Sequence, residues 1–198
     1  SSHANMWRMV GDVWDLWSDI DYLLDVCGNW TRYIAPGNWP DCDMIPLGHI
    51  AIRGERGEVR MTRLTEAEQY SLMSLFCIMK SPLMFGGDLP TSGDFAMSLL
   101  TNRDVLRMHA EAEDVHFIRN AGGSVVIASR HPESGEVYLD FINRGDEGDK
   151  DISVDLAAFG MDGPVKVKDM WSGKVSDADG ICSVTLEPHS SALLSISR

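Results

Sequence analysis

The first 112 residues alternate strand-like segments with helical periodicity three times, and this alternation is what most constrains the fold. The strand-like segments span residues 5–10, 38–44 and 82–86. A loop and a helical pattern follow each one, at about 15–28, 65–79 and 94–100, with a short further turn at 104–108. This succession predicts βα units that share a parallel sheet. Reactive side chains should lie just after the strands, where α/β folds place their sites.

Two of the helices carry signals for where they begin. Apolar residues recur at three- and four-residue steps from Leu16 to Cys27, and we expect Asp15 to be the N-cap of this helix. The second helix opens at Thr65, and Glu68 stands at capping-box spacing from it.

The rest of the chain has a different pattern. Short β-rich runs are separated by turns such as PESG, RGDEGD and DADG, which predicts an antiparallel sandwich. The runs span 115–120, 124–131, 136–143, 150–156, 165–171, 182–188 and 191–197. We therefore expect two domains, residues 1–112 and 113–198.

Three βα units cannot close a barrel, because a closed barrel of this kind needs about eight strands. An open three-stranded parallel sheet would also leave apolar faces uncovered. The chain begins SSHANMWRMV, with neither an initiator methionine nor a leader pattern, so we expect a piece of a longer protein. Either the missing N-terminal half of a barrel or self-association would cover the open edge.

Charge and cysteine content exclude several functions. The formal net charge of −13 leaves no Lys/Arg stripe for nucleic acid. The four cysteines form no CxxC pair, and we expect no metal and no cofactor. No apolar window of about 18 residues is present, so we expect no membrane span. The cysteine count names no compartment, and we expect a periplasmic or secreted protein rather than a cytoplasmic one.

Asp12 follows the first strand-like segment, directly after Gly11. A carboxylate at a strand-to-helix junction can point into a cleft, but it can equally cap the helix. Arg8, four residues earlier, either forms a structural ion pair or holds a substrate hydroxyl.

The stretch PGNWPDCDM places Trp39 beside Asp41 and Asp43. In an extended segment the two carboxylates share one face. Carboxylates beside an aromatic ring are suited to gripping a sugar. The alternatives are a capped turn before a helix and a metal pair, although no histidine stands at a helpful spacing.

These segments together resemble the melibiase-type α-galactosidases and α-N-acetylgalactosaminidases of glycoside hydrolase family 27. MWRMVGDVWDLW resembles that family's Trp-Arg-x-x-x-Asp segment on the sixth barrel strand. APGNWPDCDMIPLG resembles its Pro-Gly-Gly-Trp-Asn-Asp-Pro-Asp-Met segment on the seventh, and FCIMKSPLMFGGDL its passage into the eighth. NRDVLRMH resembles the end of the barrel, and DMWSGK with PHSSALLSI resembles the end of the C-terminal sandwich.

The resemblance implies the last three βα units of a (β/α)8 barrel, followed by an antiparallel β-sandwich. It also implies retaining hydrolysis of a terminal α-linked galactose or N-acetylgalactosamine. That reaction needs two carboxyl groups about 5–5.5 Å apart. By the same resemblance Asp12 is the general acid/base, and the substrate-binding residues are Arg8, Asp43, Met44, Trp39 and Asp41.

The sequence departs from the family pattern in two respects. The nucleophile of the family, an Asp in a Lys-x-Asp segment, would stand upstream of Ser1, so we expect this chain alone to be inactive. Cys42 stands where the family has Pro. The alternative functions are a carbohydrate-binding or structural module, and a diverged, inactive barrel relative. A sugar-binding sandwich normally exposes several Trp or Tyr residues on one sheet face, and the low number of aromatic residues in 114–198 weighs against the binding module.

Overall fold

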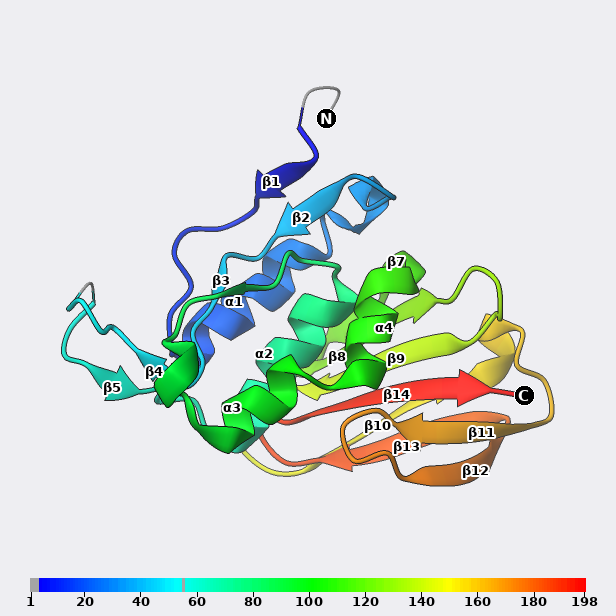
Figure 1. Cartoon of the computed structure of the whole chain (residues 1–198). Coiled ribbons are helices and arrows are strands. Elements are labelled where there is room, and N and C mark those ends of the chain that lie inside the picture. The colour runs from blue at the N-terminus through cyan, green and yellow to red at the C-terminus, as the bar shows by residue number, and fades with distance from the viewer. Residues whose placement is uncertain (1–3, 55) are drawn as a thin grey trace.

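The computed structural model describes residues 4–54 and 56–198, with short parallel strands and helices first and an antiparallel sandwich second (Figure 1). The strands of the first part are β1 (Met6–Arg8), β2 (Trp39–Asp41), β3 (Met44–Ile45), β4 (His49–Ile50), β5 (Arg60–Met61) and β6 (Met84–Phe85). Its helices are α1 (Trp17–Cys27), α2 (Glu66–Ile78), α3 (Gly93–Leu100) and α4 (Arg103–Glu111).

Parallel strand pairs are present, but they form two separate two-stranded sheets and not the single parallel sheet that the sequence predicts. β1 pairs with β2, and Arg8 stands opposite Asp41. β3 pairs in parallel with β6, and Met44 stands opposite Met84. The segment 38–44, predicted as one strand, is two strands, because the chain turns at Asp43, where φ is +80°. One half of this segment therefore pairs with the preceding strand and the other half with the following one.

The helix predictions are confirmed in part. The capping box of Thr65 and Glu68 is present at the start of α2. The prediction that Asp15 caps α1 is wrong: Leu16 is the N-cap, without a side-chain hydrogen bond. The turn expected at 104–108 belongs to the longer helix α4, capped by the Asn102 side chain. The β4–β5 hairpin, which projects from the molecule in Figure 1, was not predicted.

The second part is a sandwich of a six-stranded sheet, in the order β12-β11-β14-β9-β8-β7, and the pair β10-β13. Its strands are β7 (Glu113–Ala121), β8 (Ser124–Arg130), β9 (Val137–Asn143), β10 (Lys150–Asp155), β11 (Pro164–Asp169), β12 (Val175–Asp179), β13 (Ile181–Leu186) and β14 (Ser191–Ser197). The β8–β9 pairing across the PESG turn is antiparallel. β12 lies where the sequence suggested only the DADG turn, because its residues pair along β11.

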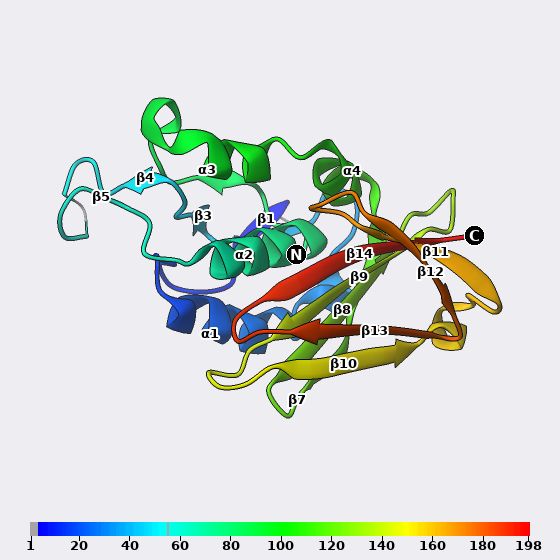
Figure 2. The ribbon, with the colours of Figure 1, turned by 90° about the horizontal axis from the view of Figure 1, so that it is seen from below.

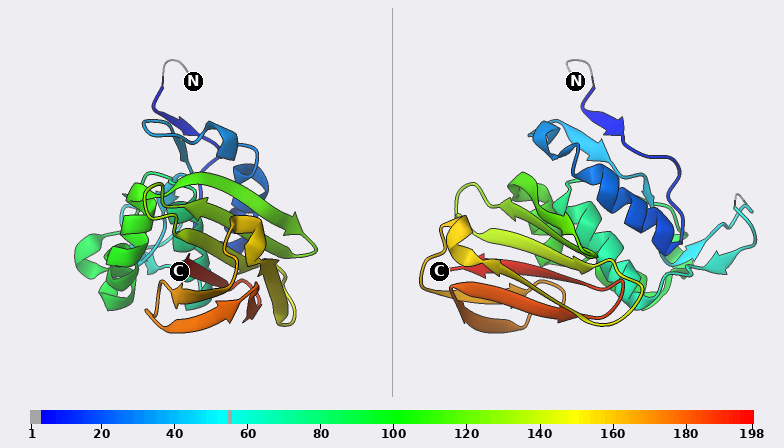
Figure 3. Two further views of the ribbon diagram at one scale, coloured as in Figure 1. Left: turned by 90° about the vertical axis from the view of Figure 1, so that its right-hand side faces the viewer. Right: turned by 180° about the vertical axis from the view of Figure 1, so that it is seen from behind.

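Helix α2 joins the two parts through one hydrophobic core. It packs against β8, β9 and β14, and Figures 2 and 3 show α1 and α2 between the parallel strands and the six-stranded sheet. Leu72 and Phe76 of α2 share a buried cluster with Tyr138 and Leu193 of the sheet and with Ile45 of β3. Burial on both sides holds α2 and the strands it follows in a fixed position on the sandwich.

No helix in the described part of the chain is long and apolar enough to cross a membrane.

Candidate functional site

Arg8, the last residue of β1, links two of the predicted site carboxylates. Its Nη2 lies 3.2 Å from Oδ1 of Asp12 and donates to the carbonyl oxygen of Gly11 at 2.9 Å. Its Nη1 lies 2.8 Å from Oδ1 of Asp43. The ion pair that the sequence left as one of two roles for Arg8 is therefore present, with 40% of the Arg8 side chain still exposed.

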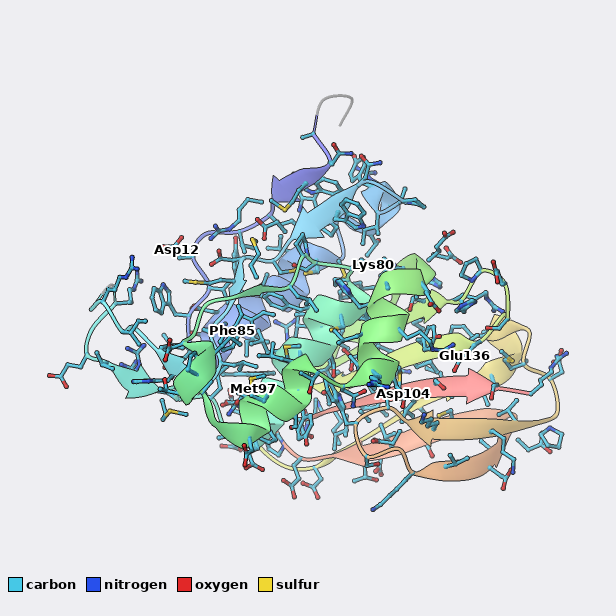
Figure 4. The ribbon with its side chains drawn as sticks, in the orientation of Figure 1. Asp12, Lys80, Phe85, Met97, Asp104 and Glu136 are labelled. Atoms are coloured by element: carbon cyan, nitrogen blue, oxygen red, sulfur yellow. The ribbon has the colours of Figure 1, made fainter. Side chains whose placement is uncertain are left out.

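Asp12 does not cap helix α1. That helix begins at Trp17, and the amide of Trp14 donates to the carboxylate of Asp19 instead. The Asp12 side chain is 67% exposed. Figure 4 shows it at the outer edge of the loop between β1 and α1. The helix-cap alternative is excluded, and the carboxylate remains open to a ligand.

Asp43 is the buried member of this cluster. Its side chain is 10% exposed, and its Oδ2 accepts the amide of Val13 at 2.7 Å. One carboxylate therefore binds the guanidinium from β1 and the peptide bond that follows Asp12. Two charge-assisted hydrogen bonds of this kind fix the loop that carries Asp12.

Asp41 does not share a face with Asp43, contrary to the extended geometry expected for this segment. Its Oδ1 accepts the amide of Asp43 at 2.8 Å, and the residue is 6% exposed. An aspartate can close a turn in this way through a backbone amide two residues on. Asp41 therefore supports the turn and does not present a second free carboxylate.

Asp15 has a partner that no sequence signal revealed. Its side chain is 1% exposed and accepts two hydrogen bonds from Arg60 of β5, at 2.9 and 2.5 Å, and one from the amide of Arg63. Burial opposes ionisation, but the hydrogen bonds of Arg60 and Arg63 outweigh it and hold the pKa of Asp15 below its usual value. The pair fastens the β4–β5 hairpin to the loop after β1.

Met44 begins β3 directly after the Asp43 turn and is half-buried. A Cβ atom at Gly86 would stand 2.7 Å from the Met44 sulfur. Gly86 therefore leaves room for the Met44 side chain where β3 and β6 lie side by side.

Trp39 is not part of the Arg8 cluster. It begins β2, at the amino end of the strand, and lines a cavity of about 320 Å³ together with Lys80 and Glu111. Lys80 donates to the carbonyl oxygens of Ala110 and Ala112 at the end of α4, far from Asp12 in Figure 4. A contact between Trp39 and a ligand at Asp12 stays a prediction.

The cluster thus offers one exposed carboxylate, an arginine and a buried carboxylate that orients both. Such a group can donate or accept a proton and can bind hydroxyl groups. Within residues 4–54 and 56–198, no three His, Cys, Asp or Glu side chains are grouped so as to hold a metal ion.

Comparison with known proteins gives the same family for both parts of the chain. The family described as "Alpha galactosidase A" matches residues 1–111, and the "Alpha galactosidase C-terminal beta sandwich domain" matches residues 122–196. The chain is 24% identical to alpha-galactosidase 2 of Arabidopsis thaliana over 98% of its length and 47% of the relative. It is 25% identical to the alpha-N-acetylgalactosaminidase of Gallus gallus over 87% of its length and 42% of the relative.

Among solved structures, a GH27 β-L-arabinopyranosidase from Geobacillus stearothermophilus is 36% identical, with a TM-score of 0.94. The match covers 98% of this chain and 45% of that one. The chain therefore spans about half the length of the relatives it matches. With a family match over more than half of its residues, the chain belongs to the α-galactosidase A (melibiase) family, glycoside hydrolase family 27.

Proposed function

We propose that this chain is the C-terminal part of a retaining glycoside hydrolase and that Asp12 is its general acid/base. The parallel part would be the last three of the eight βα units of a barrel. The observation that carries the proposal is the Arg8 bridge: an exposed carboxylate after β1 is joined through one guanidinium to the buried Asp43 after β2. Family membership gives this cluster its chemical meaning.

In this mechanism Asp12 protonates the leaving-group oxygen and then removes a proton from the attacking water. Arg8 and Asp43 orient it, because Arg8 contacts Asp12 directly and Asp43 holds the following amide. The second carboxylate, the nucleophile, would come from the N-terminal part of the barrel. The chain alone is therefore expected to be inactive.

The open face of the parallel strands supports this incomplete state. Met6, Trp39 and Met84 are large apolar residues with 46%, 37% and 39% of their surface exposed. Met6 and Trp39 stand opposite each other on β1 and β2, and Met84 lies on β6, in the separate β3–β6 pair. Exposed apolar surface of this kind marks a contact with another part. We propose that further βα units cover this face. A self-associated dimer is the alternative.

The substrate is a terminal α-galactoside or α-N-acetylgalactosaminide, as the names of the curated relatives suggest. A β-L-arabinopyranoside is a second candidate, because a β-L-arabinopyranosidase shows 36% identity. That sugar has the ring configuration of an α-D-galactoside without the hydroxymethyl group. The α-galactoside and the β-L-arabinopyranoside therefore differ only at C5 and present the same bond to Asp12.

The test is a chimera that joins the N-terminal part of the Geobacillus arabinopyranosidase to this chain. We expect it to hydrolyse aryl glycosides that the 198-residue chain leaves intact. Asp12→Asn should lower kcat/KM by about 10²–10⁴-fold on a methyl glycoside. The loss should be much smaller on a dinitrophenyl glycoside, whose leaving group needs no proton.

Asp94→Asn, which changes an exposed carboxylate in α3, is the matched control and should retain full activity. Equal losses on both substrates would show that Asp12 has a structural role only. A chimera that binds arabinose without turning over a substrate would favour the diverged, inactive relative.

A further inference from the structure

The Asp43 turn adopts a conformation that needs external support. Asp43 has φ of +80°, a backbone angle that residues other than glycine rarely adopt. Strain of this kind persists only where the surroundings hold it in place. One supporting interaction comes from Asp41, whose carboxylate accepts a hydrogen bond from the amide of Asp43.

The second supporting interaction comes from Ser81, in the link between α2 and β6. Its Oγ accepts the amide of Cys42, the residue between the two aspartates, at 3.0 Å. Ser81 is fully buried, and so is Cys42. A buried amide left without an acceptor carries the full cost of its desolvation. The hydrogen bond to Ser81 Oγ spares the Cys42 amide this cost.

Ser81 is itself fixed from two sides. Its amide donates to the carbonyl oxygen of Phe76 at 3.0 Å, which ties it to the end of α2. Its carbonyl oxygen lies 2.8 Å from Nε2 of His109 in α4. The serine therefore transmits the position of two packed helices to the turn.

We propose that Ser81 is a positioning residue for Asp43 and, through Asp43, for Asp12. The route runs from Ser81 Oγ to the Cys42 amide, then to the Asp43 carboxylate, which holds Arg8 and the amide of Val13. The catalytic meaning of this route rests on the proposed function, whereas the coupling itself does not.

The test is amide hydrogen exchange on the 198-residue chain. For each amide, the exchange rate in Ser81→Ala is divided by the rate in the unchanged chain. This ratio should be about tenfold larger for Val13 than for Phe141 in β9. Ser92→Ala is the matched control. Ser92 is also buried, and its Oγ accepts the amide of His49 in β4, away from the Asp43 turn. It should leave the ratio of Val13 to Phe141 exchange unchanged.

A second variant separates the hydrogen bond from the packing of Ser81. Proline at position 42 has no N–H, and Asp41 before it is in a strand, a conformation that a following proline favours. The double variant Ser81→Ala/Cys42→Pro therefore leaves no amide unpaired and should restore Val13 protection to within about threefold of the unchanged chain.

The proposal is overturned if Ser81→Ala affects Val13 and Phe141 equally, as a purely global loss of stability would. It is also overturned if the Val13 amide is no better protected in the double variant than in Ser81→Ala, or if the double variant fails to fold. None of these outcomes depends on hydrolysis, so they are distinct from failure of the chimera, which tests Asp12.

Discussion

Two regions of the molecule bury carboxyl groups, and they treat the charge in opposite ways. At the ends of the parallel strands, Asp15 and Asp43 are almost inaccessible, yet arginine side chains and backbone amides reach both. In the core between α2 and the six-stranded sheet, Asp140 of β9 is 0% exposed. Neither of its carboxylate oxygens has a hydrogen-bond partner among the described residues.

The difference shows that burial alone does not identify a carboxylate that belongs to the candidate site. Burial raises the pKa of Asp140 well above its usual value, because a carboxylate without partners is disfavoured in an apolar core. The pKa of Asp15 moves in the other direction, because Arg60 and Arg63 donate to the charged form. The carboxyl groups near the candidate site are therefore distinguished by their hydrogen-bond partners. Asp140 has none among the described residues and lowers the stability of the fold, a loss that the surrounding apolar core offsets.

The largest expected effect comes from removing Asp15, one of the buried carboxylates that have arginine partners. Asp15→Ala leaves Arg60 without its carboxylate, and breaking a buried pair costs about 3–5 kcal/mol. Because the folded pKa of Asp15 is lowered, its contribution is present above the unfolded pKa and is lost as the pH falls through the folded pKa. Urea unfolding at several pH values measures both effects. Asp94→Ala, at an exposed position, should change stability by less than about 0.5 kcal/mol.

The unpartnered side should respond with the opposite sign. Asp140→Asn keeps the shape but cannot ionise. The raised pKa means that the stability of the unchanged chain is highest below the unfolded pKa and falls as the pH rises towards the folded pKa.

The unfolding free energy of the Asn variant relative to the unchanged chain should therefore increase with pH between the unfolded and the folded pKa of Asp140, by up to about 1.4 kcal/mol per pH unit. Denaturant titrations at pH 4, 5, 6 and 7 measure this slope. A difference that does not vary with pH would mean that Asp140 is ionised in the fold.

The smallest effect sharpens the comparison by removing an exposed pair. Asp25 of α1 lies 2.6 Å from Arg144, with 57% of its side chain exposed, and Arg144 also binds Asp21. The Arg144 hydrogen bond lowers the pKa of Asp25. Even so, Asp25→Asn should cost less than about 1 kcal/mol, because water and Asp21 replace most of the interaction. Thermal unfolding checks it, and a loss as large as that of Asp15→Ala would contradict this ranking.

Much of the fold was predictable because it depends on local patterns. Two β-rich runs joined by the PESG turn located the β8–β9 hairpin, and the Thr65 capping box located the start of α2. Asp15 shows the limit of such patterns. Its position before a helix suggested a cap, but an arginine 45 residues away in the chain binds it instead. Pairings over that distance leave no periodic trace in the sequence.

The sequence by itself determined the two-part organisation, the family and the set of candidate residues after each strand, because periodicity and motif spacing are local properties of the chain. Only the tertiary structure decided which contacts those residues make. It turned Asp41 inward, placed Trp39 at the other end of its strand, and joined Asp12 to Asp43 through Arg8. Hydrogen bonds between segments depend on how α2 packs between the strands and the sandwich, and that packing exists only once the whole chain is folded.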